Sequence, residues 1–315
     1  VQLDQAQQEL IIRVTEAYFN VLAAVDDLQF AQSEKTAIAR QLEQAEKRFE
    51  VGLIPVTDVK EAQSSYDRAV AREIEAQTGV TLAQDALSTI TSLPAEPLRT
   101  VGDRMQLLTP EPNDADEWVL TAMEQNLALL IAEYDTKIAQ QQIELQRARH
   151  LPTLDIVASH SDYDTGGISG PYESEDSKIG IELNIPIFEG GRAYYRTTEA
   201  RHQHRASLHE QEQIRRETRQ FTRDAFFKMV AGISRVNAFA RSVESAEVAA
   251  ESSEAGFQVG TRTSVDVLIA LRNVYEAKRD YARSRYDYLL DSLRLKQAAG
   301  ILQSEDLQQI ETWLE

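Results

Sequence analysis

Three histidines that stand close together are the first residues in this sequence that could do chemistry. His202, His204 and His209 fall within one long helical pattern, and histidine nitrogens are common zinc ligands. Only His202 and His209 share a helix face, and they lie two turns apart, which is too far for a single ion. We therefore expect neither a metal nor a cofactor.

The composition argues against most other chemistry. The sequence has no cysteine, so it offers no disulfide framework and no thiolate, and it shows no phosphate-cradling glycine loop and no Ser/His/Asp grouping. Acidic residues number 51 against 33 basic ones, a net charge of −18, whereas binding of nucleic acid needs a basic face. We therefore expect no enzyme. The charge suits a solvated surface or a water-filled passage that favours cations.

A short segment that occurs twice carries a clearer signal. Residues 49–59 return as residues 257–267, at an offset of 208, with Phe, Val, Gly, Asp and Val in the same places. The two glycines, Gly52 and Gly260, are expected to close one helix each, and Thr57 or Ser264 to help start the next. Each copy predicts a helix–turn–helix, and the two copies predict a duplicated unit.

Long helices must position these turns, and the composition favours them because Gly and Pro are scarce. Apolar stripes predict helices over residues 3–50, 57–92, 113 to about 148, 192 to about 257, and 264–299, where Gly300 ends the last one. In 57–92 alanine recurs every seventh residue, which lets a partner helix approach closely, and Glu73 is the one polar break. Four prolines make residues 94–113 an irregular connection. No apolar run of 18 residues predicts a membrane-spanning helix.

Between residues 151 and 191 the apolar period changes from about 3.6 to 2. Apolar residues alternate with polar ones over 154–160 and more strictly over 179–187, on either side of a glycine-rich tip at 166–171. This predicts a β-hairpin with one apolar face. A lone hairpin is barely stable in water, so it must pair with others, and its pattern fits a lipid-facing β-barrel segment. The alternative is a small sheet packed on a helix in a soluble α+β domain.

Several motifs together resemble the TolC-type outer-membrane efflux channel family. They are residues 17–22, 51–59, 150–154, 185–191 and, most specific, 259–267, with 286–289 downstream. The resemblance spans essentially the whole sequence. It implies a mainly α homotrimer in which long antiparallel coiled-coil helices form an α-barrel, and in which the hairpin contributes to a shared transmembrane β-barrel. Members of the family carry a further helix and hairpin before the point where this sequence begins. The repeat offset independently places such a first hairpin before residue 1, so we expect that it and its leading helix are either missing from this sequence or never existed.

The resemblance also divides the sequence into four parts. Residues 1–149 would be the helices of the first repeat, with a turn at 51–56 and an equatorial segment at 94–113. Residues 150–191 would be the hairpin of the membrane barrel. Residues 192–299 would be the helices of the second repeat, with a turn at 259–263, and residues 300–315 would be an equatorial C-terminal segment.

A gate at the helix tips is implied as well. Arg262 is expected to bond across a subunit boundary to Asp58, near Thr57, and Asp266 to form a ring of three carboxylates at the entrance. The simpler alternative is that both aspartates are first-turn acids favoured by the helix dipole and that Arg262 is a solvated turn residue.

Two residues of this gate depart from the family pattern. Ile269 stands where the family's best-studied member has a second acidic ring, and Phe257 stands in place of a tyrosine. We expect weaker binding of blocking cations and the loss of one hydroxyl bond in the closed state. The turns themselves are implied to be the docking site of a periplasmic adaptor, through Gly52, Leu53, Gly260, Thr261, Arg262 and Thr263.

The function implied is a passive exit duct of a tripartite efflux or type I secretion system, in the bacterial outer membrane and extending into the periplasm. Its partners would be two further copies of itself, the adaptor, outer-membrane lipid and, indirectly, an inner-membrane transporter, without nucleic acid. The alternative is a soluble, elongated coiled-coil scaffold or adaptor protein, which would need no detergent in solution.

Overall fold

The structure, a computed structural model, describes residues 1–93, 98–102, 105–167 and 170–314. Parts of the connection expected at 94–113 and of the hairpin tip expected at 166–171 therefore lie outside the described residues. The chain divides into two compact units, Val1–Leu127 with Glu217–Glu315, and Ala128–Arg216. We call them the first and the second unit. They cut across the four parts expected from the repeat, because two helices pass from one unit into the other.

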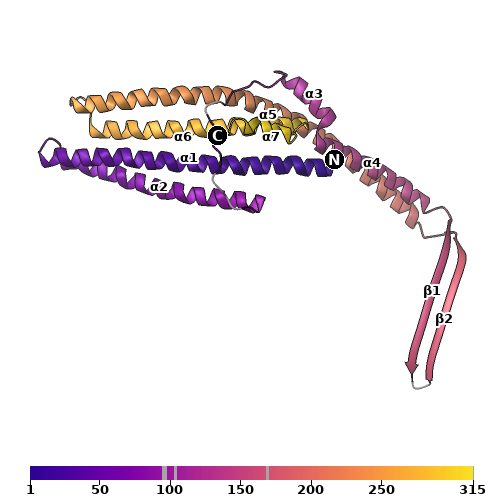
Figure 1. The fold of residues 1–315 in the computed structure, drawn as a ribbon. Helices are drawn as coiled ribbons and strands as arrows, with labels where there is room; N and C mark the ends of the chain where they lie inside the picture. Colours follow the sequence, from indigo (N-terminus) through magenta and orange to yellow (C-terminus); the bar gives the residue numbers. More distant parts are fainter. Residues whose placement is uncertain (94–97, 103–104, 168–169, 315) are drawn as a thin grey trace. The chain divides into compact units, whose positions relative to one another are not determined.

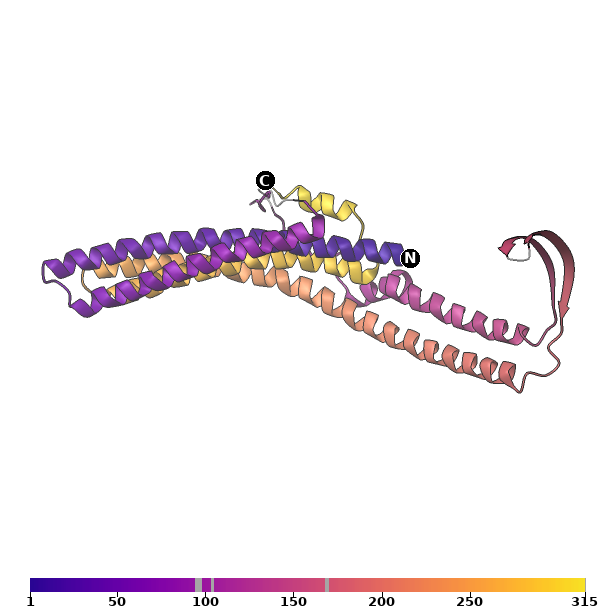
Figure 2. The ribbon, with the colours of Figure 1, turned by 90° about the horizontal axis from the view of Figure 1, so that it is seen from below.

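Long antiparallel helices build the first unit (Figures 1 and 2). They are α1 (Gln2–Glu50), α2 (Val56–Thr91), α6 (Ser264–Ala299) and the C-terminal part of α5 (Arg192–Gln258). The four helices predicted at these places are confirmed, with each end within one residue of the prediction. Two short helices, α3 (Ala115–Gln125) and α7 (Glu305–Glu311), also belong to this unit. Among the described residues no helix combines the length and the apolar content needed to cross a membrane.

Apolar clusters hold these helices together, and two of them bear on the predictions. The larger centres on Leu289 and Leu293 of α6, and it includes Phe19 of α1, whose ring stacks on Tyr286 with centroids 5.7 Å apart. The smaller lies toward the turns and contains Ala62 and Ala69 of α2, which are 0% and 2% exposed. Its alanines confirm the close helix approach predicted from their spacing, because larger side chains would hold the backbones apart.

The single helix predicted from 113 to about 148 is wrong. The structure has α3 and, after a break at Asn126, α4 (Leu127–Ala148). Asn126 is extended, and its Nδ2 donates to the backbone oxygen of Ala298, 2.9 Å away. A Cβ on Gly300 would lie 2.1 Å from the backbone oxygen of Gln125. The break is thus where the chain packs against the end of α6, a tertiary contact that outweighs local helix propensity. The predicted start is confirmed, because Asp114 caps α3.

The predicted hairpin is confirmed in the second unit. Strands β1 (Thr153–Gly167) and β2 (Gly170–Asn184) pair antiparallel, and the register places Leu154 opposite Leu183, Ile156 opposite Ile181 and Ala158 opposite Ile179. The apolar residues therefore share one face, as alternation requires. Strand β2 ends at Asn184, so Ile185 and Ile187, predicted to continue it, lie beyond the strand. Pro186 between them lacks the N–H that a longer ladder would need.

The apolar face of the hairpin is uncovered within the described part of the chain. Ile156, Ile179 and Ile181 are 81%, 86% and 75% exposed. In a soluble domain this face would be packed on a helix, which is not the arrangement seen here.

Candidate functional site at the helix turns

The first turn ends α1 through a glycine in the left-handed region. Gly52 has φ 72°, its N–H donates to the backbone oxygen of Phe49, and the N–H of Leu53 donates to that of Arg48, both at 2.9 Å. This pair of hydrogen bonds is the Schellman motif, and it satisfies carbonyls that the last helical turn leaves free. A side chain with a Cβ is disfavoured at this φ, so glycine is required.

The second turn repeats this geometry at the end of α5. Gly260 has φ 80°, its N–H donates to Phe257 O at 3.2 Å, and the N–H of Thr261 donates to Gly256 O at 2.8 Å. The predicted role of both glycines is confirmed. The two turns lie at the same end of the first unit (Figure 1).

The helices that follow the turns start differently from each other, and the predicted caps are wrong. Helix α2 begins after Pro55, which has no side-chain cap. Helix α6 begins after Thr263, whose hydroxyl accepts from the N–H of Asp266 at 3.2 Å, while the Asp266 carboxylate accepts from the N–H of Thr263 at 2.9 Å. This reciprocal pair is a capping box. Thr57 and Ser264 instead lie in the first turn of their helices.

The capping box fixes the charge of Asp266. Hydrogen bonds from the backbone N–H and the hydroxyl of Thr263, together with the nearby charge of Arg262, hold the pKa of this carboxyl below its usual range. Asp266 is thus an ionised first-turn acid, which is the arrangement that the simpler alternative predicts.

The other residues expected at the gate fall into two groups. Thr57 donates to Asp58 at 3.3 Å on α2. Arg262 and Ile269 line a groove between α5 and α6 together with Asp266. Among the described residues no hydrogen bond or ion pair joins Asp58 to Arg262 within the protomer.

Phe257, expected to replace a tyrosine of the family, is a core residue. It is 5% exposed, and the guanidinium carbon of Arg48 lies 4.2 Å from the centre of its ring. This cation–π contact joins the last turn of α1 to the last turn of α5. The ring of Phe257 thus contacts the guanidinium of Arg48, at the position where the loss of a tyrosine hydroxyl bond was expected.

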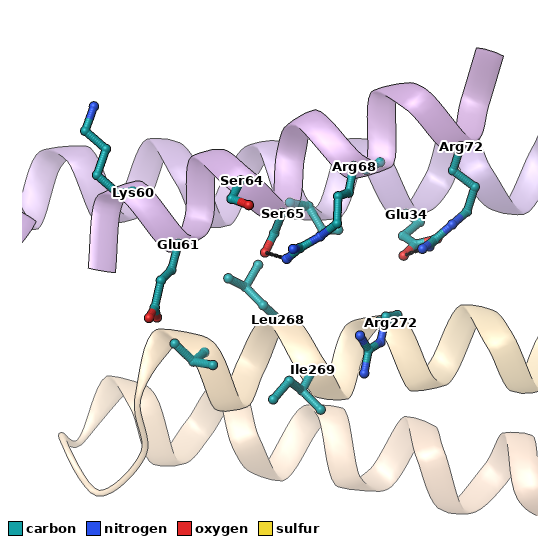
Figure 3. A pocket seen from close by; sticks show the side chains of 13 residues that line it. Glu34, Lys60, Glu61, Ser64, Ser65, Arg68, Arg72, Leu268, Ile269 and Arg272 are labelled. Carbon is teal, nitrogen blue, oxygen red and sulfur yellow. Dashed lines mark hydrogen bonds and ion pairs between the residues drawn. The ribbon is translucent and has the colours of Figure 1, made fainter. Parts of the chain in front are cut away.

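A cleft between α1, α2 and α6 contains a charge cluster that sequence reasoning missed (Figure 3). Glu34 is 1% exposed, and its Oε1 accepts from Nη1 of Arg72 on α2 at 2.5 Å. Its Oε2 lies 3.5 Å from Nη1 of Arg279 on α6. Beside it Lys35 pairs at 2.5 Å with Glu73, the polar break noted in the α2 seam. One buried carboxylate therefore connects α1 to both neighbouring helices.

A signal for Glu34 does exist in the sequence. It falls in the same row of α1 as Ala31, Ile38 and Ala45, all of which are buried. A carboxylate within such a row either has a charged partner or destabilises the folded state, because an isolated buried charge is strongly unfavourable. Its partners could not be named from the sequence, because they lie 38 and 245 residues away.

Comparisons with known proteins agree with this architecture. The family model described as outer membrane efflux protein matches residues 1–92 and 118–301. Outer membrane protein TolC of Vibrio cholerae is 36% identical over 313 residues, which cover 98% of this chain and 71% of that protein. Outer membrane protein TolC of Escherichia coli is 36% identical over 312 residues, covering 96% of this chain and 63% of that protein. The chain thus spans about two thirds of the length of these relatives.

A solved structure shows the same fold. The Campylobacter jejuni CmeC outer membrane channel superimposes with a TM-score of 0.75 at 16% identity, covering 98% of this chain and 67% of the other. At this identity the likeness concerns the fold alone.

Proposed function

This chain belongs to the outer membrane efflux protein family, and we propose that it acts as a passive exit duct for efflux or type I secretion. The observation that carries the proposal is the combination of two antiparallel helix pairs closed by the same turn with a hairpin whose apolar face is uncovered. In this proposal residues 1–149 and 192–299 are the two repeats, the hairpin joins copies from other subunits in the outer membrane, and the helices extend into the periplasm. The duct has no catalytic site.

The exposed hairpin supports assembly into a homotrimer. A two-stranded sheet has two unpaired edges as well as an uncovered apolar face, and both are unfavourable unless another chain or lipid covers them. Neighbouring copies of the hairpin would pair with the edges, and outer-membrane lipid would cover the face.

We propose that the gate lies at the two turns. Asp58 and Arg262 have no ion-pair partner among the described residues of their own protomer, which supports a bond between them across a subunit boundary. Asp266 is ionised, so three copies around one axis would repel one another and attract cations. Thr57, Phe257 and Ile269 complete this proposed gate.

The turns also supply a surface for a periplasmic adaptor. Val51, Leu53 and Val259 are 70%, 72% and 76% exposed beside Gly52 and Gly260. Exposed aliphatic side chains on rigid turns are suited to docking the tip of a partner. In this proposal Thr261, Arg262 and Thr263 form the polar part of the surface, and an inner-membrane transporter supplies the energy through the adaptor.

Single-channel conductance in planar bilayers tests the gate. The Arg262→Ser variant of the full-length trimer is expected to conduct more than the parent, because a bond that closes the tips is lost. Arg241→Ser is the matched control, since Arg241 is an exposed residue of α5 with no ion pair among the described residues, and it should leave conductance unchanged. Equal conductance of Arg262→Ser and the parent would count against the gate assignment.

Sedimentation of the full gene product separates the duct from the scaffold alternative. The duct should be a trimer that needs detergent to remain in solution. A monodisperse soluble monomer without detergent would reject the duct and favour an elongated scaffold.

A further inference from the structure

Three arginines line a pocket at the base of the hairpin, within the second unit. Arg149 follows α4, and Arg192 and Arg196 lie at the start of α5, with Glu189 as the carboxylate among them. Nη2 of Arg192 donates to Oε1 of Glu189 at 2.5 Å. Arg149 and Arg196 have no ion-pair partner among the described residues. The pocket therefore carries a surplus of positive charge in a chain whose net charge is −18.

The arginines act on one small region rather than on separate surfaces. Arg149, Arg192 and Arg196 line the same pocket as the Glu189 carboxylate. One carboxylate can balance only one of the three cations. The remaining charge requires an anion from outside the chain or solvation by water alone.

Exposed apolar and aromatic side chains lie close in sequence to the residues that line this pocket. Ile187 and Phe188 are 94% and 87% exposed, and Tyr194, Tyr195 and Leu151 are 63%, 70% and 62% exposed. Ile187 and Phe188 follow β2, on whose apolar face Ile179, Ile181 and Leu183 lie.

The chemistry changes sharply at the end of this face. Apolar residues continue to Ile187 and Phe188, and the next seven residues include Glu189, Arg192 and two tyrosines. Tyrosine rings and arginines with long apolar stems are the side chains typical of the boundary between lipid and water.

We infer that this pocket binds the phosphate of a phospholipid headgroup at the edge of the membrane. The inference rests on the proposed function, which places the hairpin in a membrane. Guanidinium groups present two parallel N–H donors that match phosphate oxygens, and Arg149 and Arg196 are the two that are available for this. The adjacent Phe188, Tyr194 and Tyr195 would lie against the acyl chains. Arg192 stays paired with Glu189 and holds the floor of the pocket.

Native mass spectrometry of the full-length trimer measures this binding directly. The trimer is titrated in detergent with phosphatidylglycerol, and separately with inorganic phosphate. We expect phosphatidylglycerol to bind and the Arg149→Gln, Arg196→Gln double variant to bind it about thirtyfold more weakly, because each arginine near a lipid surface contributes about fivefold. Each single variant should lose about fivefold.

Matched variants separate this site from a general effect of charge. Arg219→Gln with Arg241→Gln removes the same charge from two exposed residues of α5 in the first unit, and it should leave lipid affinity unchanged. The Arg149→Lys, Arg196→Lys variant keeps both charges but loses the parallel N–H donors, so its affinity should lie between those of the parent and the double glutamine variant. The trimer mass in the same spectrum reports assembly, and a single variant replaces the double one if the latter does not assemble.

Two outcomes would overturn the inference. The first is equal lipid affinity of the parent and the assembled Arg149 and Arg196 variants. The second is inorganic phosphate that competes with the lipid at equal concentration, which would make the pocket a site for free anions. Either result, with normal conductance of the same trimers in planar bilayers, removes the lipid site and leaves the duct in place. A parent chain that neither forms trimers nor conducts rejects the proposed function itself.

Discussion

Leaving the Glu34 carboxylate without its arginine partners should destabilise the fold strongly. Glu34 is 1% exposed, whereas the side chains of its partners Arg72 and Arg279 are 35% and 23% exposed. If Glu34 is removed, both arginines can turn toward water. If both arginines are removed, the carboxylate stays buried without a partner. The two halves of the cluster are therefore not equivalent, although they form the same ion pairs.

This asymmetry sets the expected magnitudes. Removing the partners of a buried charge costs about 3–5 kcal/mol, which we expect for Arg72→Met with Arg279→Met. Arg72→Met alone leaves Arg279 beside the carboxylate and should cost about half as much. Glu34→Gln should cost about 1 kcal/mol or less, because partly exposed ion pairs contribute little. Adding Glu34→Met to the double variant should recover most of the loss, since apolar replacement of a whole buried cluster is often neutral.

Urea unfolding followed by far-UV circular dichroism measures these differences, at one fixed protein concentration because the proposed assembly would add to stability. Lys47→Met is the control, since Lys47 and Glu43 form an exposed pair on α1, and its midpoint should not move. The reasoning is refuted if the double arginine variant unfolds at the same urea concentration as Glu34→Gln. That result would mean that water reaches the carboxylate.

Three further predictions concern two glycines with positive φ, one half-buried carboxyl group and one helix cap. Gly52→Ala should lower the free energy of unfolding by about 1–2 kcal/mol through its φ of 72° alone. Gly300→Ala should lower it by about 3 kcal/mol or more, because its Cβ would also overlap the backbone at the end of α3. The midpoints of urea unfolding compare the two variants. Burial raises the pKa of Asp291, so the folded chain holds this proton more tightly than the unfolded chain, and the stability of the fold falls as pH rises. Asp291→Asn should therefore raise the midpoint of urea unfolding at pH 7 but not below pH 3.8. Thr263→Ala should speed amide exchange at the start of α6 about fivefold, and the difference should shrink as pH falls through the lowered pKa of Asp266.

The sequence was sufficient for the features that depend on local pattern. Apolar stripes of period 3.6 placed α1, α2, α5 and α6, and strict alternation placed the hairpin and its apolar face. The positions of the glycines predicted where the helices end, because the left-handed φ of a Schellman motif depends on a single residue. These elements needed no knowledge of their neighbours.

Two of the features that escaped prediction are set by distant parts of the chain. The break at Asn126 depends on the end of α6, where Asn126 contacts Ala298. The pairing of Glu34 depends on residues of two other helices. In both cases a contact between elements outweighed the local pattern. Ser264 was expected to help start α6, but Thr263 forms a capping box with Asp266, a local pattern that the sequence contains.

Comparison of the two copies of the turn shows how a duplicated segment can acquire two roles. At the repeat offset, Thr263 corresponds to Pro55 and Asp266 to Asp58. Thr263 binds Asp266 in a capping box, whereas Pro55 has no side-chain donor, so among the described residues Asp58 receives a side-chain hydrogen bond from Thr57 alone. The same aspartate is therefore committed within its own turn in one copy and available to a neighbouring subunit in the other. This difference, which follows from proline in place of threonine, is what the proposed bond between Asp58 and Arg262 requires.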